Sequence, residues 1–348
     1  MNCIEQTIGN YQFTIYTYLD HLNFPFEAES ILPEQTLISI TIIMDELDKG
    51  KEKWMGLTEN GWKRSIPEDI AIFYQTYNQV LQKNEMVSKH INQYYQKGKE
   101  TFAYFPYSTD QFFLHYSQDT SIVHLYGKEE SVYRIIFDFL TIKAPLLPLH
   151  ASGVGVGEKA GILVSESGCG KTSILIKLLQ NKACFLADDS VFTNEKKVFR
   201  VSDQLSIRKE FPNDPKIKQI IQSHKEDKVG INIKKEASYL GFSLSHSAYE
   251  KQNFFILQKE ERKWKGIKQA IEPFPCLNHH SFWCMNYVVK DHKKAWVTRL
   301  LQDSCGFWEE KLKQGYPIYV DFNHLDQTRQ EIENILTKGD YHEKIVGD

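Results

Sequence analysis

The sequence lacks the segments that direct a chain across or into a membrane. Its first residues, MNCIEQTIGNYQF, contain neither a basic stretch nor the apolar core of a signal peptide. No run of about 18 apolar residues occurs anywhere in the chain, so no membrane-spanning helix is expected. These absences predict a cytoplasmic protein without a membrane partner.

Several other features are also scarce. The formal net charge is only −3, so nothing in the overall charge indicates a nucleic-acid or membrane-surface partner. The six cysteines form no C-x-x-C pair and have no secretory context, which predicts reduced thiols. There is no internal repeat, which argues against a solenoid or propeller.

What is present is the composition of a globular protein. Hydrophobic residues make up 41% of the 348 residues and aromatic residues 13%. This length allows two domains. We expect a smaller α+β N-terminal domain in residues 1–140, a second domain in residues 141–339 and a polar tail in residues 340–348.

The expected N-terminal domain contains both strand and helix patterns. Residues 11–16 and 36–44 are typical of strands, residues 67–99 predict a long helix, and residues 101–126 predict short aromatic strands. Trp54 and Trp62 lie in a charged, glycine-containing stretch. They could anchor a partner, although we favour packing against their own domain. The N-terminal domain is a candidate for substrate recognition.

The most informative stretch is residues 147–192. Apolar runs at 148–156 and 160–165 predict two strands joined by a tight turn, and Ile174, Leu175, Leu178 and Leu179 then recur at helical spacing. Between the second strand and the helix lies Ser165-Glu166-Ser167-Gly168-Cys169-Gly170-Lys171-Thr172. This run matches the phosphate-binding pattern G-x-x-x-x-G-K-[ST], except that Ser165 replaces the first glycine.

The residue types explain the chemistry of such a loop. Small residues allow backbone N–H groups to point at phosphate oxygens, and the helix that follows adds its positive end. Lys171 would reach the outer phosphates and the Thr172 hydroxyl would bind a magnesium ion. The predicted nucleotide-binding residues are Ser165, Glu166, Ser167, Gly168, Cys169, Gly170, Lys171, Thr172 and Ser173. The alternative is a glycine-rich turn with no ligand.

Two adjacent carboxylates follow the helix. Residues 183–186 predict a short buried strand that ends in Ala187-Asp188-Asp189. In an open α/β sheet the carboxyl ends of the strands are where ligands bind. One carboxylate can therefore ligate magnesium while the other accepts a proton from a hydroxyl nucleophile. The alternative is a solvated Asp-Asp turn.

These residues together carry a family resemblance. Leu149-His150-Ala151-Ser152, the loop Ser167-Gly168-Cys169-Gly170-Lys171-Thr172, the tripeptide Ala187-Asp188-Asp189 and the run Leu205-Ser206-Ile207-Arg208 resemble the catalytic domain of HPr kinase/phosphorylase. The likeness is greater to the HPr-kinase-related proteins of peptide maturation, including lasso-peptide kinases. It implies an α/β fold with a P-loop kinase core, a mixed sheet with flanking helices, in residues 141–339.

The resemblance also implies roles for single residues. Asp188 would be the catalytic base, Asp189 would hold magnesium together with Thr172, and His150 would lie close to the transferred phosphoryl group. The implied cofactors are ATP and Mg²⁺, the implied partner is a peptide or small protein with an acceptor serine, and relatives that form hexamers make a homo-oligomer plausible. The chain has no counterpart to the later signature of the bifunctional enzyme, so phosphorylase activity is not expected.

Residues 206–270 are basic, with fourteen Lys or Arg and eight Asp or Glu. Such a stretch can receive nucleotide phosphates or an acidic peptide, or be a solvated face. Arg208 is the candidate phosphate-neutralising cation. The resulting hypothesis is a kinase of a peptide serine. The alternatives are a kinase of a small hydroxylated metabolite such as free serine, a nucleotide-binding regulator or ATPase, and a scaffold that binds a precursor peptide.

Overall fold

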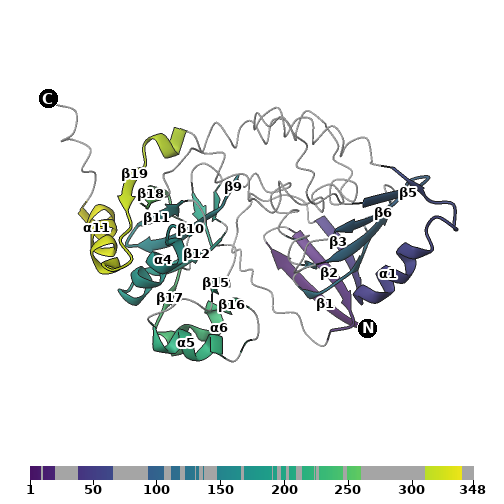
Figure 1. The fold of residues 1–348 in the computed structure, drawn as a ribbon, viewed down its shortest axis with the longest axis horizontal. Coiled ribbons are helices and arrows are strands. Elements are labelled where there is room, and N and C mark those ends of the chain that lie inside the picture. Colours follow the sequence, from purple (N-terminus) through teal and green to yellow (C-terminus); the bar gives the residue numbers. More distant parts are fainter. Residues whose placement is uncertain are drawn as a thin grey trace. The chain divides into compact units, whose positions relative to one another are not determined.

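The computed structural model describes residues 1–8, 11–19, 38–65, 93–105, 111–117, 122–129, 131–132, 136, 147–165, 168–189, 191–193, 197–200, 204–208, 214–222, 224, 227–245, 249–259 and 310–338. The protein has an α/β architecture with mixed sheets and a few helices. Its described residues form two compact units, one before Leu147 and one from Leu147 onward (Figure 1). No helix of the described segments is long and apolar enough to cross a membrane.

The first unit is built on an eight-stranded mixed sheet of order β1-β2-β3-β8-β7-β6-β5-β4. The pairs β2·β3 and β3·β8 are parallel and the remaining pairs are antiparallel. The elements are β1 (Asn2–Ile8), β2 (Tyr11–Thr17), β3 (Ile38–Asp45), α1 (Leu47–Met55), β4 (Lys63–Arg64), β5 (Gln93–Lys97), β6 (Glu100–Phe105), β7 (Phe112–Ser117) and β8 (Ile122–Tyr126).

An aromatic cluster covers one region of this sheet beneath α1. Phe102, Phe113 and Tyr126 are buried, and Trp54 and Trp62 pack against them. Aromatic pairs in such tilted and edge-to-face arrangements add to the stability gained by burial. The prediction that both tryptophans pack against their own domain is confirmed.

The predicted helix over residues 67–99 is wrong at its C-terminal end. Residues Gln93–Lys97 form β5, which pairs with β6 through a turn at Gly98, whose φ is +59°. The first part of that predicted helix lies outside the described residues. The two tyrosines of this segment favour a strand, and they pair with Ala103 and Phe102 across the sheet.

The second unit contains a six-stranded mixed sheet of order β17-β12-β10-β11-β18-β19. Small sheets of order β14-β13-β9 and β15-β16 accompany it. The strands are β9 (Leu147–Leu149), β10 (Ala151–Val156), β11 (Lys159–Val164), β12 (Cys184–Ala187), β13 (Val191–Thr193), β14 (Val198–Phe199), β15 (Gln204–Arg208), β16 (Lys228–Asn232), β17 (Ser243–Leu244), β18 (Lys251–Gln258) and β19 (Tyr316–Tyr319). The helices with defined bounds are α4 (Lys171–Gln180), α5 (Pro215–Gln222), α6 (Ile233–Leu240) and α11 (Leu325–Lys338).

Several predictions for this part of the chain are confirmed. The second predicted strand is β11, and the first, residues 148–156, is confirmed from Ala151 onward as β10, whereas its first residues belong to β9 in another sheet. The strands β10 and β11 form the predicted hairpin, with its tight turn at Gly157 (φ +58°). The predicted helix after the loop is α4. Leu175, Leu178 and Leu179 of α4 are buried in one core with Ile332 and Leu336 of α11, so these two helices lie side by side on the sheet (Figure 1).

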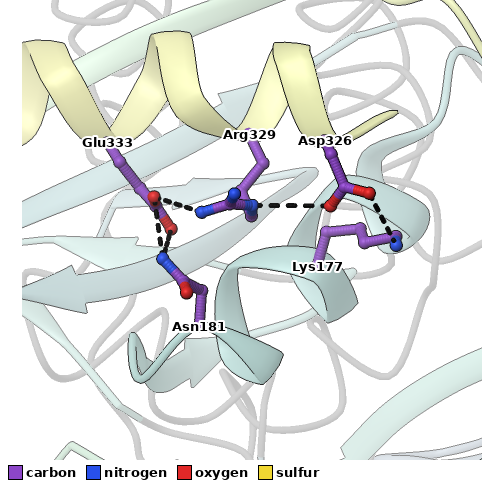
Figure 2. Close-up of polar contacts among 5 residues, drawn as sticks. All are labelled: Lys177, Asn181, Asp326, Arg329 and Glu333. Carbon is purple, nitrogen blue, oxygen red and sulfur yellow. Dashed lines mark hydrogen bonds and ion pairs between the residues drawn. The ribbon is translucent and has the colours of Figure 1, made fainter. Parts of the chain in front are cut away.

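A polar network connects α4 to α11 along their shared side (Figure 2). Asn181, directly after α4, donates to both carboxylate oxygens of Glu333, at 2.8 and 2.9 Å. Arg329 forms an ion pair with the same carboxylate. Asp326 lies 3.6 Å from Arg329 and 3.4 Å from the Lys177 ammonium, and pairs with both. The helix that begins at Lys171 is therefore held both by apolar packing and by directed polar contacts.

Candidate functional site

Strand directions bring the predicted site residues to one edge of the second sheet. The strand β10 is antiparallel to both β11 and β12, with Ala151 opposite Val164 and Gly153 opposite Ala187. The start of β10 therefore lies beside the ends of β11 and β12. Because the glycine-rich loop follows β11 and Asp188 follows β12, both meet the segment that begins at His150.

The loop between β11 and α4 has the backbone geometry that its glycines allow. Gly168 and Gly170 have φ values of +81° and +94°, in the region that disfavours side chains. The Gly170 carbonyl accepts the Ile174 N–H at 2.9 Å, which begins the hydrogen bonding of α4. Two predicted nucleotide-binding residues, Glu166 and Ser167, lie outside the described residues.

Lys171 is 92% buried, since its relative exposure is 8%. Its ammonium donates to the Ser165 carbonyl at 3.1 Å and approaches the Ser165 hydroxyl at 3.4 Å. Ser165 is not among the described non-glycine residues with positive φ. Serine at the first-glycine position therefore needs no left-handed backbone here, and its hydroxyl adds an oxygen near the lysine.

Asp188 is nearly buried and accepts hydrogen bonds from three elements. The Ser152 hydroxyl of β10 donates to Oδ1 at 2.6 Å, and the Thr172 hydroxyl of α4 donates to the same oxygen at 3.5 Å. The Ser206 N–H of β15 donates to Oδ2 at 2.9 Å. These contacts fix the carboxylate beside the first turn of α4.

Asp189 and His150 are brought together by the small sheet that contains β9 and β13. Val191 pairs with Leu149, so the residues just outside this pair approach one another. His150 Nδ1 lies 3.0 Å from the Asp189 carbonyl oxygen, a contact in which the ring nitrogen donates. Asp189 has a φ of +62°, a conformation that aspartate tolerates better than most residues.

Arg208 lies on the strand that contacts Asp188. Side chains alternate along β15, so Arg208 shares a face with Ser206, whereas Leu205 and Ile207 are buried on the other face. Arg208 itself is exposed at the end of the strand. Ser206 contacts Asp188 through its backbone N–H and not its side chain, so this contact does not direct the Arg208 side chain toward the site. No contact of Arg208 with the loop occurs among the described residues.

Cys169 is fully buried. Its place beside a helix N-terminus predicts a reactive thiol, because the helix favours the thiolate. Burial acts against this expectation, since a reagent cannot reach the sulfur without opening of the loop. Ser173, the last predicted nucleotide-binding residue, lies in the first turn of α4 and is half-buried.

The donor atoms at this edge are of the kinds that bind magnesium in proteins. Thr172 and Asp188 present a hydroxyl and a carboxylate 3.5 Å apart, and Asp189 is the next residue in the chain. Within the described ranges, no group of three or more His, Cys, Asp or Glu side chains could hold a metal ion alone. Magnesium at a phosphate site needs only one or two protein carboxylates, because phosphate and water oxygens complete its shell.

Two contributors to the site were not predicted from the sequence. Ser152 and Ser206 lie in runs that carry the family resemblance, but the resemblance implied no role for either residue, and Ser206 contributes only its backbone N–H. A serine in a strand is usually unremarkable. For Ser152, the spacing from His150 was a possible signal, because residues two apart on a strand point to the same face.

The chain was also compared with known proteins. Neither the family models nor the curated proteins with which it was compared gave a match.

Proposed function

We propose that the protein is an ATP- and Mg²⁺-dependent kinase that transfers the γ-phosphoryl group to a hydroxyl, with a serine of a peptide or small protein as the acceptor. One observation carries this proposal. The loop that contains Lys171 and Thr172, the carboxylate of Asp188 and the ring of His150 converge on one sheet edge. Phosphoryl transfer requires a phosphate cradle, a cation and a carboxylate at close quarters.

The loop residues would bind and orient the nucleotide phosphates. Backbone amides between Gly168 and Lys171 and the positive end of α4 favour phosphate oxygens. Lys171 would exchange its contact with the Ser165 carbonyl for one with the outer phosphates. Thr172 and Asp189 are the proposed magnesium ligands, with Asp188 beside the same position, and the ion would neutralise charge that develops on the transferred group.

Asp188 is the proposed base. The acceptor oxygen attacks the γ-phosphorus, a new O–P bond forms, and the bond between that phosphorus and the β,γ-bridging oxygen breaks, releasing ADP. The acceptor's proton passes to Asp188. The hydrogen bonds from Ser152 and the Ser206 N–H would hold the carboxylate in the orientation this transfer needs. His150 would lie near the transferred group and steady its charge.

A peptide acceptor is favoured by the resemblance to HPr-kinase-related proteins and by the basic composition of residues 206–270, which include Arg208. A metabolite kinase would use the same residues, whereas a nucleotide-binding regulator would need the loop without an acceptor. A scaffold would need neither Lys171 nor Asp188. These alternatives differ in where the phosphate goes.

The test is incubation with γ-labelled ATP and Mg²⁺ in three arms: serine-containing peptides, free L-serine and no acceptor. Label on peptide serine supports the proposal. Label on free serine alone indicates a metabolite kinase, free phosphate alone an ATPase, and no turnover in any arm counts against an enzyme. Lys171→Met serves as the inactive control, because loss of one charge that stabilises the transition state typically lowers turnover by about 100-fold or more.

A further inference from the structure

Three neighbouring strands of the second sheet end at the edge that carries the phosphate-binding loop. β11 and β18 are parallel, with Val164 opposite Ile256, and β18 and β19 are parallel, with Gln258 opposite Tyr319. The Val320 N–H donates to the Gln258 carbonyl at 2.9 Å and extends the second pairing. The residues that follow β18 and β19 therefore lie beside the loop, on the side away from Asp188.

The segment after β19 directly contacts that loop. A Cβ atom at Gly170 would lie 3.2 Å from both the Phe322 ring and the Val320 side chain. A real Cβ atom rarely lies this close to its neighbours. Because glycine has no Cβ, the Phe322 ring can approach the loop backbone at this position. Phe322 is half-buried and packs against the core of the second unit.

A cation accompanies the ring. The Lys259 ammonium, one residue beyond β18, lies 5.5 Å from the centroid of Phe322. An aromatic ring and a lysine thus stand together at the carboxyl ends of the two strands next to the loop strand. In open α/β sheets this edge receives the ligand, and a nucleotide anchored by its phosphates must direct its base to one side of the loop.

The segment is held in place from both ends. Asp321 accepts the Asn323 N–H at 2.8 Å and lies 2.8 Å from His324 Nδ1. Directly after His324 begins α11, which Asn181 and Lys177 tie to α4 through Glu333 and Asp326 (Figure 2). Phe322 is therefore positioned by the same helix pair that positions the loop.

We propose that Phe322, which has the Lys259 ammonium over one face of its ring, offers the opposite face for stacking with the base of the bound nucleotide. The inference rests on the proposed function, since it assigns the nucleoside half of the same ligand. Every purine presents a π-face to an aromatic ring, so this contact provides affinity and orientation more than discrimination between bases. The lysine would lie near the ribose and α-phosphate side.

The experiment compares two probes on the same protein by titration calorimetry: a non-hydrolysable ATP analogue and inorganic tripolyphosphate, each with Mg²⁺. Phe322→Leu keeps apolar packing against Gly170 but removes the stacking face. We expect about tenfold weaker binding of the analogue, as for a lost base–aromatic contact, and unchanged tripolyphosphate binding. Phe322→Trp should restore the analogue's affinity.

Tyr319→Leu is the matched control, because this aromatic side chain is 66% exposed on β19 and alternates away from the buried Ile318 and Val320. If Phe322→Leu binds the analogue and tripolyphosphate more weakly by the same factor, the ring only supports the loop. If it binds both as tightly as the unaltered protein does, the base does not contact the ring. Either result overturns the inference. Phe322→Met replaces Phe322→Leu if the latter does not fold. If the unaltered protein binds neither probe, the proposed function itself fails.

Discussion

The Ser152 hydroxyl donates a 2.6 Å hydrogen bond to Oδ1 of Asp188, and both side chains are withdrawn from solvent. The two residues are brought together because β10 runs antiparallel to β12, so the start of one strand lies beside the end of the other. A buried carboxylate needs such donors, since an unpaired charge away from water is costly. The contact links β10, which begins directly after His150, to the acidic pair.

Ser152→Ala should lower turnover more than it lowers stability. The variant removes one donor from Asp188 and leaves the carboxylate less well oriented, while loss of a buried hydrogen bond typically costs about 1–3 kcal/mol of unfolding free energy. Phosphoryl transfer rates and urea unfolding measure the two effects. Ser245→Ala is the control, because Ser245 is buried in the same unit and its described hydrogen bonds involve Phe185 and Tyr249 rather than Asp188. Equal loss of activity in both variants would argue against a positioning role for Ser152.

Gly170→Ala should abolish nucleotide binding. The residue has a φ of +94°, and a Cβ would lie 3.2 Å from Phe322 and Val320, so the loop or the segment after β19 must shift. Gly157→Ala is the matched control, because Gly157 also has positive φ (+58°) but nothing lies within 4 Å of an added Cβ. It should cost about 1 kcal/mol of stability and leave binding intact. Nucleotide binding by Gly170→Ala would contradict the close packing.

The sequence predicted the local elements of the second unit well because their signals are local. A turn at Gly157, helical spacing after Lys171 and a short apolar strand before Asp188 each fall within a few residues. What it could not predict depends on pairings between distant segments. The contact of Ser206 with Asp188 requires the position of β15, and the approach of Phe322 to Gly170 requires that β19 lie two strands from β11. The strand at Gln93–Lys97 was missed for the same reason, since its partner β6 decides its conformation.

Glu333→Ala should destabilise the second unit. The Glu333 side chain is 19% exposed and accepts hydrogen bonds from Asn181, directly after α4, and from Arg329 of α11. Its loss leaves these two donors without this acceptor. A cost of about 1–2 kcal/mol is expected, more than for an exposed ion pair. Thermal unfolding with a nucleotide-binding assay measures it. Glu331→Ala, an exposed position on the same helix, should be close to neutral; an equal effect there would mean that helix propensity, not the network, is responsible.

The first unit should lose stability on mild acidification. Burial lowers the pKa of His115 below its ordinary value of 6.5, although Glu100 opposes the shift, and burial lowers the pKa of His124, with His115 and Lys53 adding to the effect. As pH falls, the two histidines therefore take up protons in the unfolded chain before they do so in the folded chain. Their contribution to the free energy of unfolding is fully present above about pH 6.5 and decreases as pH drops below that value. Urea midpoints should decrease between about pH 7 and pH 5.5.

The double variant His115→Gln, His124→Gln should show a shallower dependence over that interval. The two rings face each other across β7 and β8 with centroids 5.7 Å apart, so both are needed for the full effect. An unchanged slope in the double variant would place the titrating groups elsewhere.

Alkylation rates should separate Cys3 from Cys169. Cys3 is exposed, whereas Cys169 is fully buried within the loop, so a reagent reaches Cys169 only when the loop opens. Peptide mass spectrometry after short exposure to iodoacetamide should find Cys3 modified first. A non-hydrolysable ATP analogue with Mg²⁺ should slow modification of Cys169 further and leave Cys3 unchanged, because only the loop is closed by phosphate. Equal rates at the two thiols would mean that the loop is open in solution, and an unchanged rate at Cys169 with the analogue would argue that no nucleotide binds there.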